Sequence, residues 1–273
     1  MSLKWLSPVS AFSLPWRRGE LIWQLAGREV EAQFKGSFLG LLWVFARPLL
    51  MLTVYTFVFG VIWPRDADGL PLGSFAMTMF CGMALYNLFS SSIGQSCGSV
   101  VGKVGFVKQV VFPLEVLPFA QTLANFLLGM AWFILLIVGI FLVYGALPWT
   151  CVLFPLILLP LFLLAMGLAW FVSSLTVYVR DMKLFIPVVL QILFFVTPIF
   201  WQLDQLKGRR AALVPYLYWN PLTGLVEAMR DVMIRGNLPD WRLLGILTAA
   251  GAGCWFLGYA WFMKTKKGFA DVM

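Results

Sequence analysis

The feature that most constrains the fold of this chain is a series of long, uninterrupted apolar stretches. A helix rises about 1.5 Å per residue and the hydrocarbon core of a bilayer is about 30 Å thick, so roughly 20 apolar residues can span it. About six such runs occur, at residues 37–63, 72–93, 117–144, 147–179, 184–203 and 243–263. The sequence therefore predicts an all-α integral membrane protein with about six transmembrane helices in a single domain over residues 1–273.

The composition agrees with a chain built for lipid. Hydrophobic residues make up 61% of the 273 residues and charged residues 12%, against roughly 45–50% and about 25% in soluble domains. A β-barrel is disfavoured because barrel strands alternate apolar and polar residues over about ten positions, whereas these runs are continuous. Pro155 and Pro160 in the fourth run allow a helix break, since proline lacks a backbone donor. We therefore expect no soluble enzymatic domain within these 273 residues.

Basic residues are distributed unevenly between the two sides of this topology. On one side of the membrane, the loops and termini hold five basic residues of the first 36 together with Lys103, Lys108, Arg180, Lys183, Lys264, Lys266 and Lys267. On the opposite side, the short loops hold only Arg65. By the positive-inside rule both termini are expected in the cytoplasm. The net charge of +8 is therefore attributed to topology and membrane lipid, with no nucleic acid partner.

Two segments outside the spans have amphipathic helical patterns. In residues 16–34, apolar positions recur near helical spacing with charged residues between them, which predicts an N-terminal cytoplasmic helix at the membrane interface. This helix is either a plain membrane anchor or also a docking site for a cytoplasmic partner. The apolar positions are Leu21, Ile22, Leu25, Val30 and Phe34.

The second segment, 204–242, is too long for a structureless connection. Its apolar residues also recur at helical spacing, which predicts an amphipathic or re-entrant external segment between helices five and six. Two interpretations remain, an interfacial cap and a gate over a pathway. The apolar residues are Leu222, Leu225, Val226, Met229 and Met233.

Catalytic and energy-coupling residues are scarce. The glycine-rich stretch 98–104 has three residues between its glycines where an ATP-binding loop needs four, and Val104 where that loop needs Ser or Thr. The chain has no His, so it has neither a Ser-His-Asp triad nor a histidine-ligated metal. The last four runs have no ionisable residue in their interiors. We therefore expect a transport subunit rather than an enzyme, with no metal or cofactor, whose energy source is on another subunit.

Arg47 and the aromatic residues are candidates for a pathway through the membrane. Arg47, inside the first run and followed by Pro48, either snorkels to the cytoplasmic interface or faces an internal polar pathway. Aromatic residues make up 16% of the chain, and most would ordinarily belong to interfacial belts. Their density in the first and fifth spans also fits a conduit lining that contacts the apolar faces of sugar rings. The candidates are Trp43, Phe45, Tyr55, Phe59, Phe194, Phe195, Phe200 and Trp201.

Four segments, in this order and over nearly the whole chain, resemble a known family. They are LIWQLAGREVEAQFKGSFLGLLWVFARPLLMLTVYTFVFG at 21–60, VFPLEVLP at 111–118, VRDMKLFIPVVLQILFFVTPIFW at 179–201 and YWNPLTGLVEAMRDV at 218–232. They are similar to the membrane permease of polysaccharide-export ABC transporters, in the branch that exports lipid-linked O-antigen. Capsule and teichoic-acid exporters are relatives of that branch.

The resemblance implies a homodimer of six-helix permeases in the bacterial inner membrane, working with two separate cytoplasmic subunits that bind ATP and Mg. It also implies a substrate polysaccharide carried on polyprenyl pyrophosphate. Residues at the ATPase-coupling surface would be Arg28, Glu29, Glu31 and Glu115. Residues of an external gate would be Tyr218, Asn220, Pro221, Glu227 and Arg230.

A basic cytoplasmic rim would attract the pyrophosphate, because Lys and Arg suit phosphate oxygens. The same residues also satisfy the topology and anionic lipids. Alternative functions are a capsule, teichoic-acid, drug or lipid exporter permease, and a non-transporting membrane assembly subunit. A secondary carrier is disfavoured by the missing mid-membrane acids. The candidates for the rim are Arg17, Arg18, Arg47, Lys103 and Lys108.

Overall fold

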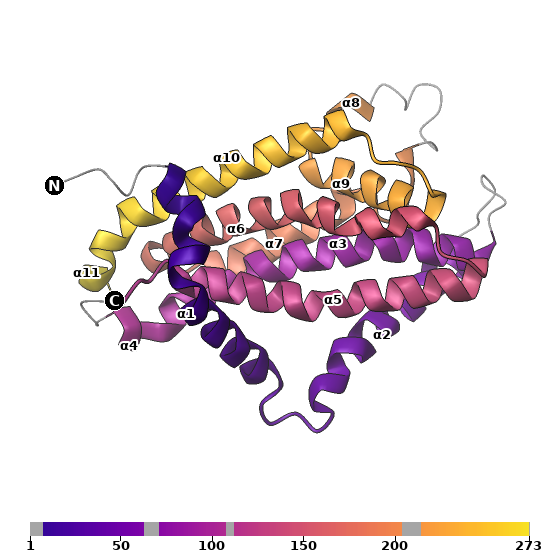
Figure 1. The fold of residues 1–273 in the computed structure, drawn as a ribbon. Coiled ribbons are helices and arrows are strands. Elements are labelled where there is room, and N and C mark those ends of the chain that lie inside the picture. Colours follow the sequence, from indigo (N-terminus) through magenta and orange to yellow (C-terminus); the bar gives the residue numbers. More distant parts are fainter. Residues whose placement is uncertain (1–7, 63–70, 108–111, 204–213, 273) are drawn as a thin grey trace.

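The computed structural model describes residues 8–62, 71–107, 112–203 and 214–272 and folds them into a bundle of helices (Figure 1). The all-α class is confirmed, and the described residues form no strand. The helices are α1 (Pro8–Phe34), α2 (Trp43–Phe57), α3 (Leu72–Ser99), α4 (Val104–Val107), α5 (Val116–Tyr144), α6 (Phe154–Tyr178), α7 (Met182–Val196), α8 (Val214–Leu217), α9 (Pro221–Arg230), α10 (Trp241–Thr265) and α11 (Phe269–Val272).

Five segments within the described residues are long and apolar enough to cross a membrane. Three of these segments are longer than the α-helices α2, α6 and α10 that they contain, because short 3-10 or π-helical turns continue those helices. The fourth is continuous across Pro160, so the break that this proline allows does not occur. The five segments are Gly40–Ile62, Leu72–Ser99, Val116–Tyr144, Trp149–Tyr178 and Trp241–Gly268.

The fifth apolar run of the sequence differs most from its expected form. It was expected to span the membrane over 184–203, but α7 has 15 residues and ends at Val196. A straight helix of that length extends only about 22 Å, short of the hydrocarbon thickness. The helix ends because Thr197 precedes Pro198 and adopts an extended conformation with ψ 137°, as the residue before a proline prefers.

The apolar face of α1 packs against other helices of the bundle. This helix begins at Pro8, before the expected residue 16, and is kinked at Arg18, where φ is −129° and ψ is 21°. Its buried residues Ile22 and Leu25 belong to one apolar cluster with Leu117 of α5 and Trp255 of α10. The helix is therefore anchored to the bundle itself, and its charged residues other than Glu29 are exposed.

Helices α1 and α2 diverge from each other as the two arms of a V, with residues 35–42 at its apex (Figure 1). The turn is made by Gly36 and Gly40, whose φ angles are 81° and 51°, in a region that glycine adopts at little cost. The first span therefore begins at Gly40 rather than at residue 37.

Helix α9 is buried in the bundle rather than lying on its surface. It packs against α3, α6 and α10 and continues as a π-helical segment, Asp231–Arg235. The apolar face that the sequence indicates is enclosed by these helices. Its residues are Leu222, Leu225, Val226, Met229 and Met233, each at most 2% exposed.

Candidate functional site

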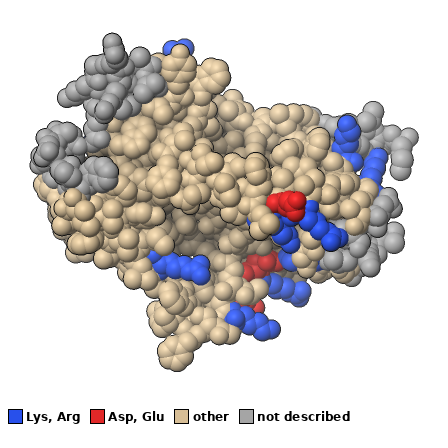
Figure 2. All heavy atoms as spheres, turned by 180° about the vertical axis from the view of Figure 1, so that it is seen from behind, with Lys and Arg blue, Asp and Glu red and all other residues tan. Residues whose placement is uncertain are grey.

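A cleft of about 640 Å³ opens between the end of α1, α2, and a wall formed by α3, α5 and α7. Its volume falls within the range of small-molecule sites, about 300–1,000 Å³. Figure 2 shows a hollow in this face of the molecule, with Lys and Arg side chains on both sides of it. The polar residues lining the cleft are Gln33, Arg47, Asn87, Ser90, Ser91, Gln95, Asn125 and Gln191.

Three helices meet in the cleft through a network of amide side chains. Gln95 of α3 accepts hydrogen bonds at Oε1 from Gln121 Nε2 of α5, at 2.8 Å, and from Gln33 Nε2 of α1, at 3.1 Å. Gln33 Nε2 also lies 3.2 Å from Asn125 Oδ1, and Asn125 Nδ2 donates to the Ser91 carbonyl at 3.1 Å. The end of α1 is thus joined to the wall of the cleft by hydrogen bonds.

Arg47 is the only charged residue in the cleft lining formed by the described residues. It lies in the first turns of α2, next to the buried Pro48, and its side chain is exposed. Among the described residues Arg47 makes no ion pair, so its guanidinium is available to an anion. Of the five rim candidates, Arg47 lines the cleft, and Arg17 and Arg18 lie exposed on α1. Lys103 forms an ion pair with Glu29 of α1, and Lys108 is outside the described residues.

Five of the eight aromatic candidates form one ring cluster between α2 and the end of α7. The ring centroids of Phe59 and Phe200 are 4.4 Å apart, and those of Tyr55 and Phe200 are 5.3 Å apart. Phe194 and Phe195 complete the cluster, and Tyr55 and Phe194 also line the cleft.

The other three aromatic candidates lie apart from the ring cluster. Trp43 lines the cleft from α2. Phe45 and Trp201 belong to neither the cleft lining nor the cluster. The first and fifth apolar runs therefore do meet through aromatic side chains, but only part of the candidate set takes part.

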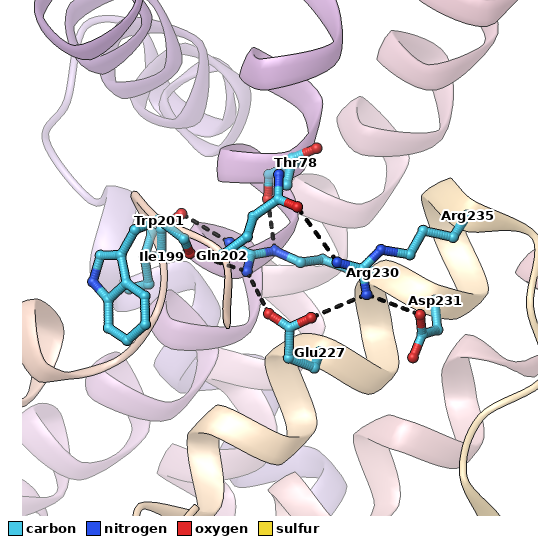
Figure 3. A network of polar contacts seen from close by, with 8 residues as sticks. All are labelled: Thr78, Ile199, Trp201, Gln202, Glu227, Arg230, Asp231 and Arg235. Carbon is cyan, nitrogen blue, oxygen red and sulfur yellow. Dashed lines mark hydrogen bonds and ion pairs between the residues drawn. The ribbon is translucent and has the colours of Figure 1, made fainter. Parts of the chain in front are cut away.

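A second polar site surrounds Arg230 of α9. Only 1% of Arg230 is exposed, and Figure 3 shows its guanidinium surrounded by acceptors. It donates to Glu227 Oε1 at 2.8 Å, to the Ile199 carbonyl at 2.9 Å, and to the Trp201 and Thr78 carbonyls at 3.3 Å. Arg230 thereby joins α9 to α3 and to the segment after α7.

Arg235 extends this network toward the surface. Its Nη1 lies 3.0 Å from both Glu227 Oε2 and Asp231 Oδ1, and its Nη2 lies 3.4 Å from Gln202 Oε1 (Figure 3). Burial alone would lower the pKa of Arg235, but the hydrogen bond to Asp231 and the charges of Glu227 and Asp231 raise the pKa above its usual value. Arg235 therefore stays charged, and Glu227 is held between two cations.

Three of the external gate candidates mark the start of α9. Asn220 caps this helix by accepting at Oδ1 from the Leu222 backbone N–H at 3.1 Å, and Pro221 occupies the first turn. Asn220 Nδ2 also donates to Thr197 Oγ1 at 3.0 Å. Tyr218 is 40% exposed just before the cap. The cap thus connects α9 directly to the end of α7.

The ATPase-coupling candidates divide into paired and exposed residues. Lys103 forms an ion pair with Glu29 of α1, and Glu115 pairs with Lys266 at 2.7 Å. The carbonyl of Glu115 also accepts from Trp170 Nε1 at 2.9 Å. Arg28 and Glu31 are exposed on α1. Glu115 therefore links the start of α5 to the end of α10, while Arg28 and Glu31 face outward.

The amide residues of the cleft are functional candidates that our sequence reasoning missed. Asn87, Asn125 and Gln191 stand inside otherwise apolar runs, and Gln95 lies two residues beyond one. Polar residues in membrane spans commonly face neighbouring helices or cavities. The sequence therefore contains a signal for these uncharged polar residues, although only Arg47 and aromatic residues were expected to line a pathway. Among the described residues, no group of three or more His, Cys, Asp or Glu side chains could hold a metal ion.

Comparison with known proteins gives a family and several relatives. Residues 20–234 match the family described as ABC-2 type transporter. The chain is 29% identical over 258 residues to the O-antigen export system permease protein RfbA of Myxococcus xanthus, covering 93% of this chain and 95% of that protein. A Klebsiella pneumoniae RfbA is 25% identical with the same coverages. The polysialic acid transport protein KpsM of Escherichia coli is 26% identical, covering 88% of this chain and 91% of KpsM.

Proposed function

Because this chain belongs to the ABC-2 type transporter family, we propose that it is the membrane-spanning subunit of an ATP-driven exporter that moves polyprenyl-pyrophosphate-linked O-antigen polysaccharide across the bacterial inner membrane. The observation that carries this proposal is the cleft, in which one cation lies among amide and aromatic side chains. Two relatives named for O-antigen export, matched over 93% of the chain, support the same substrate class.

The chemistry of the cleft fits a lipid-linked glycan better than a purely apolar cargo. The Arg47 guanidinium can form charge-assisted hydrogen bonds with pyrophosphate oxygens. The cleft's amides can hydrogen-bond to hydroxyls, and its aromatic rings offer apolar faces to sugars. A drug or lipid exporter would not need this density of uncharged hydrogen-bonding groups.

Energy for transport comes from a separate ATP-binding protein, as in other permeases of this family. We expect two copies of that subunit, carrying ATP and Mg, beneath a homodimer of this chain. The exposed residues Arg28 and Glu31 on α1 are candidates for contact with the ATP-binding subunit. Both termini would then lie on the cytoplasmic side, and α9 would lie near the outer side.

A capsule exporter permease is the second candidate function, favoured by the similarity to KpsM. The two functions differ in the polymer carried rather than in the membrane subunit's fold. Measuring transport of each polymer by the same reconstituted complex distinguishes the two functions.

The test is reconstitution of the chain with its ATP-binding subunit in proteoliposomes that contain a labelled polyprenyl-pyrophosphate glycan. We expect ATP-dependent transfer of the glycan across the membrane, measured by its accessibility to a glycan-cleaving enzyme added to the receiving side. A complex whose ATP-binding subunit cannot hydrolyse ATP is the control. An active ATPase complex that moves neither O-antigen nor capsule glycolipid would contradict the proposal.

A further inference from the structure

One wall of the cleft carries more uncharged hydrogen-bonding groups than helix packing requires. Gln33, Gln95 and Asn125 bond to one another or to a carbonyl and join α1, α3 and α5. Asn87 and Gln191, which also line the cleft, make no side-chain hydrogen bond between helices within the described residues. Their amide groups are available to a molecule that enters the cleft.

These two amides differ from residues that only hold helices together. Asn87 Oδ1 lies 3.5 Å from Ser91 Oγ of its own helix, while its Nδ2 has no partner among the described residues. Gln191 is exposed in the cleft on α7. A polar group in a membrane span is costly without a partner. A bound ligand would supply partners for both amides.

The charge of the lining restricts what that ligand can be. Arg47 is the only cation, and no carboxylate is present, in the part of the lining that the structure describes. An amide both donates and accepts hydrogen bonds, as a sugar hydroxyl does, whereas a sugar carboxylate only accepts them. With Arg47 bound to pyrophosphate, no second cation of the described lining would remain for an acidic sugar.

Aromatic rings stand beside these amides. Trp43 and Tyr55 line the cleft from α2, and Trp132 and Phe194 line it from α5 and α7. Ring faces pack on the apolar faces of sugars while the amides bind the sugar edges. The cleft thus offers both kinds of contact that a neutral sugar presents.

We propose that Asn87 and Gln191 form a subsite that binds the sugars next to the pyrophosphate and selects uncharged, hydroxyl-bearing units. This inference rests on the proposed export function. Arg47 holds the pyrophosphate, while the two amides bind hydroxyls of the adjoining sugars. Gln95 and Asn125 are positioning residues that hold the wall in place through their bonds to Gln33.

The experiment measures equilibrium binding of three labelled lipids to the full chain in nanodiscs. The probes are undecaprenyl pyrophosphate, the same lipid carrying a neutral dihexose, and the same lipid carrying a disaccharide with a uronic acid. The variants are Asn87→Leu and Gln191→Leu, which remove the amide at similar size. Gln24→Leu is the matched control, because Gln24 is exposed on α1, outside the cleft, and its side chain bonds to Glu20 alone among the described residues.

We expect the wild-type chain to bind the neutral glycolipid about tenfold more tightly than the bare lipid, as one or two net hydrogen bonds would give. Each cleft variant should lose most of this gain while binding undecaprenyl pyrophosphate as the wild type does. The control should behave as the wild type, and the uronic acid lipid should show a smaller gain than the neutral glycolipid.

Other results would overturn the inference in distinguishable ways. A full sugar gain in both variants, or an equal gain with the uronic acid lipid, would reject the subsite and leave the export function standing. Loss of all lipid binding in Asn87→Leu and Gln191→Leu but not in Gln24→Leu would assign the amides to helix packing instead. A wild-type chain that binds none of the three lipids would reject the proposed function itself.

Discussion

Gly258 of α10 lies directly against the carbonyl group of Gly167 in α6, so the two helices touch backbone to backbone. A methyl group at Gly258 would collide with that carbonyl. About two helical turns earlier in α10, a Cβ on Gly251 would lie 2.9 Å from the Pro160 carbonyl oxygen. Small residues permit such close approach of membrane helices, where dispersion contacts replace the hydrophobic effect as the main attraction.

Replacing Gly258 with Ala should separate α6 from α10 and destabilise the folded chain by about 1–3 kcal/mol, the usual cost of overpacking. Gly253→Ala is the matched control, because a Cβ there meets no atom within 4 Å. The measurement is the midpoint of thermal unfolding in detergent for both variants. Equal midpoints for the two would show that the α6 and α10 backbones are not in close contact.

Replacing Arg230 with Met should destabilise the chain by about 3 kcal/mol, because it breaks a buried ion pair. This value is at the low end of the usual range, since Glu227 keeps its ion pair with Arg235. The carbonyls of Ile199 and Trp201 would also lose their donor. Chemical denaturation followed by Trp fluorescence measures this effect. Arg242→Met, at an exposed position on α10, should change stability by no more than about 0.5 kcal/mol.

Replacing Arg47 with Gln should lower ATP-driven glycolipid transport about tenfold or more, since a charged hydrogen bond to phosphate is worth about 1.5–3 kcal/mol. Insertion and stability should be unchanged, because Arg47 makes no ion pair among the described residues. Arg180→Gln removes an exposed charge outside the cleft and is the control. Wild-type transport by Arg47→Gln in the reconstituted complex would remove Arg47 from the pathway.

Exchanging the charges of Glu29 and Lys103 tests whether their ion pair couples α1 to the segment before α5. Glu29→Lys alone places two cations together and should reduce ATP-driven transport, and the double variant Glu29→Lys with Lys103→Glu should restore it. The pair is partly exposed, so its effect on stability should stay near 1 kcal/mol or below. A double variant as impaired as the single one would argue that Glu29 acts through another contact.

The sequence alone was sufficient for the membrane class and for most of the spans. Run length and hydropathy are local properties, and the bilayer requires each spanning segment to satisfy them independently of its neighbours. The start of α5 and the end of α3 differ from expectation only by a few residues. The sequence did not predict the short α7. The last apolar residues of this run lie beyond the helix, after Thr197, where the carbonyls of Ile199 and Trp201 accept hydrogen bonds from Arg230.

Glycine spacing illustrates what a one-dimensional pattern leaves open. Gly98 and Gly102 are four residues apart, a spacing that can permit close helix approach, yet a Cβ on either would meet no atom within 4 Å. The close approach instead joins Gly167 to Gly258, which belong to different helices. Spacing along one helix identifies a smooth face, but the partner and the crossing point are set by the packing of the bundle.

The sequence by itself determined that this chain crosses a membrane several times, because apolar length is encoded in each segment separately. It also supplied Arg47 and the aromatic residues as candidates. Only the tertiary structure decided that amides from α1, α3, α5 and α7 line one cleft with Arg47, and that Arg230 is buried among carbonyls. The reason is that a side chain's neighbours depend on how each helix is rotated and packed, which hydropathy and spacing do not specify.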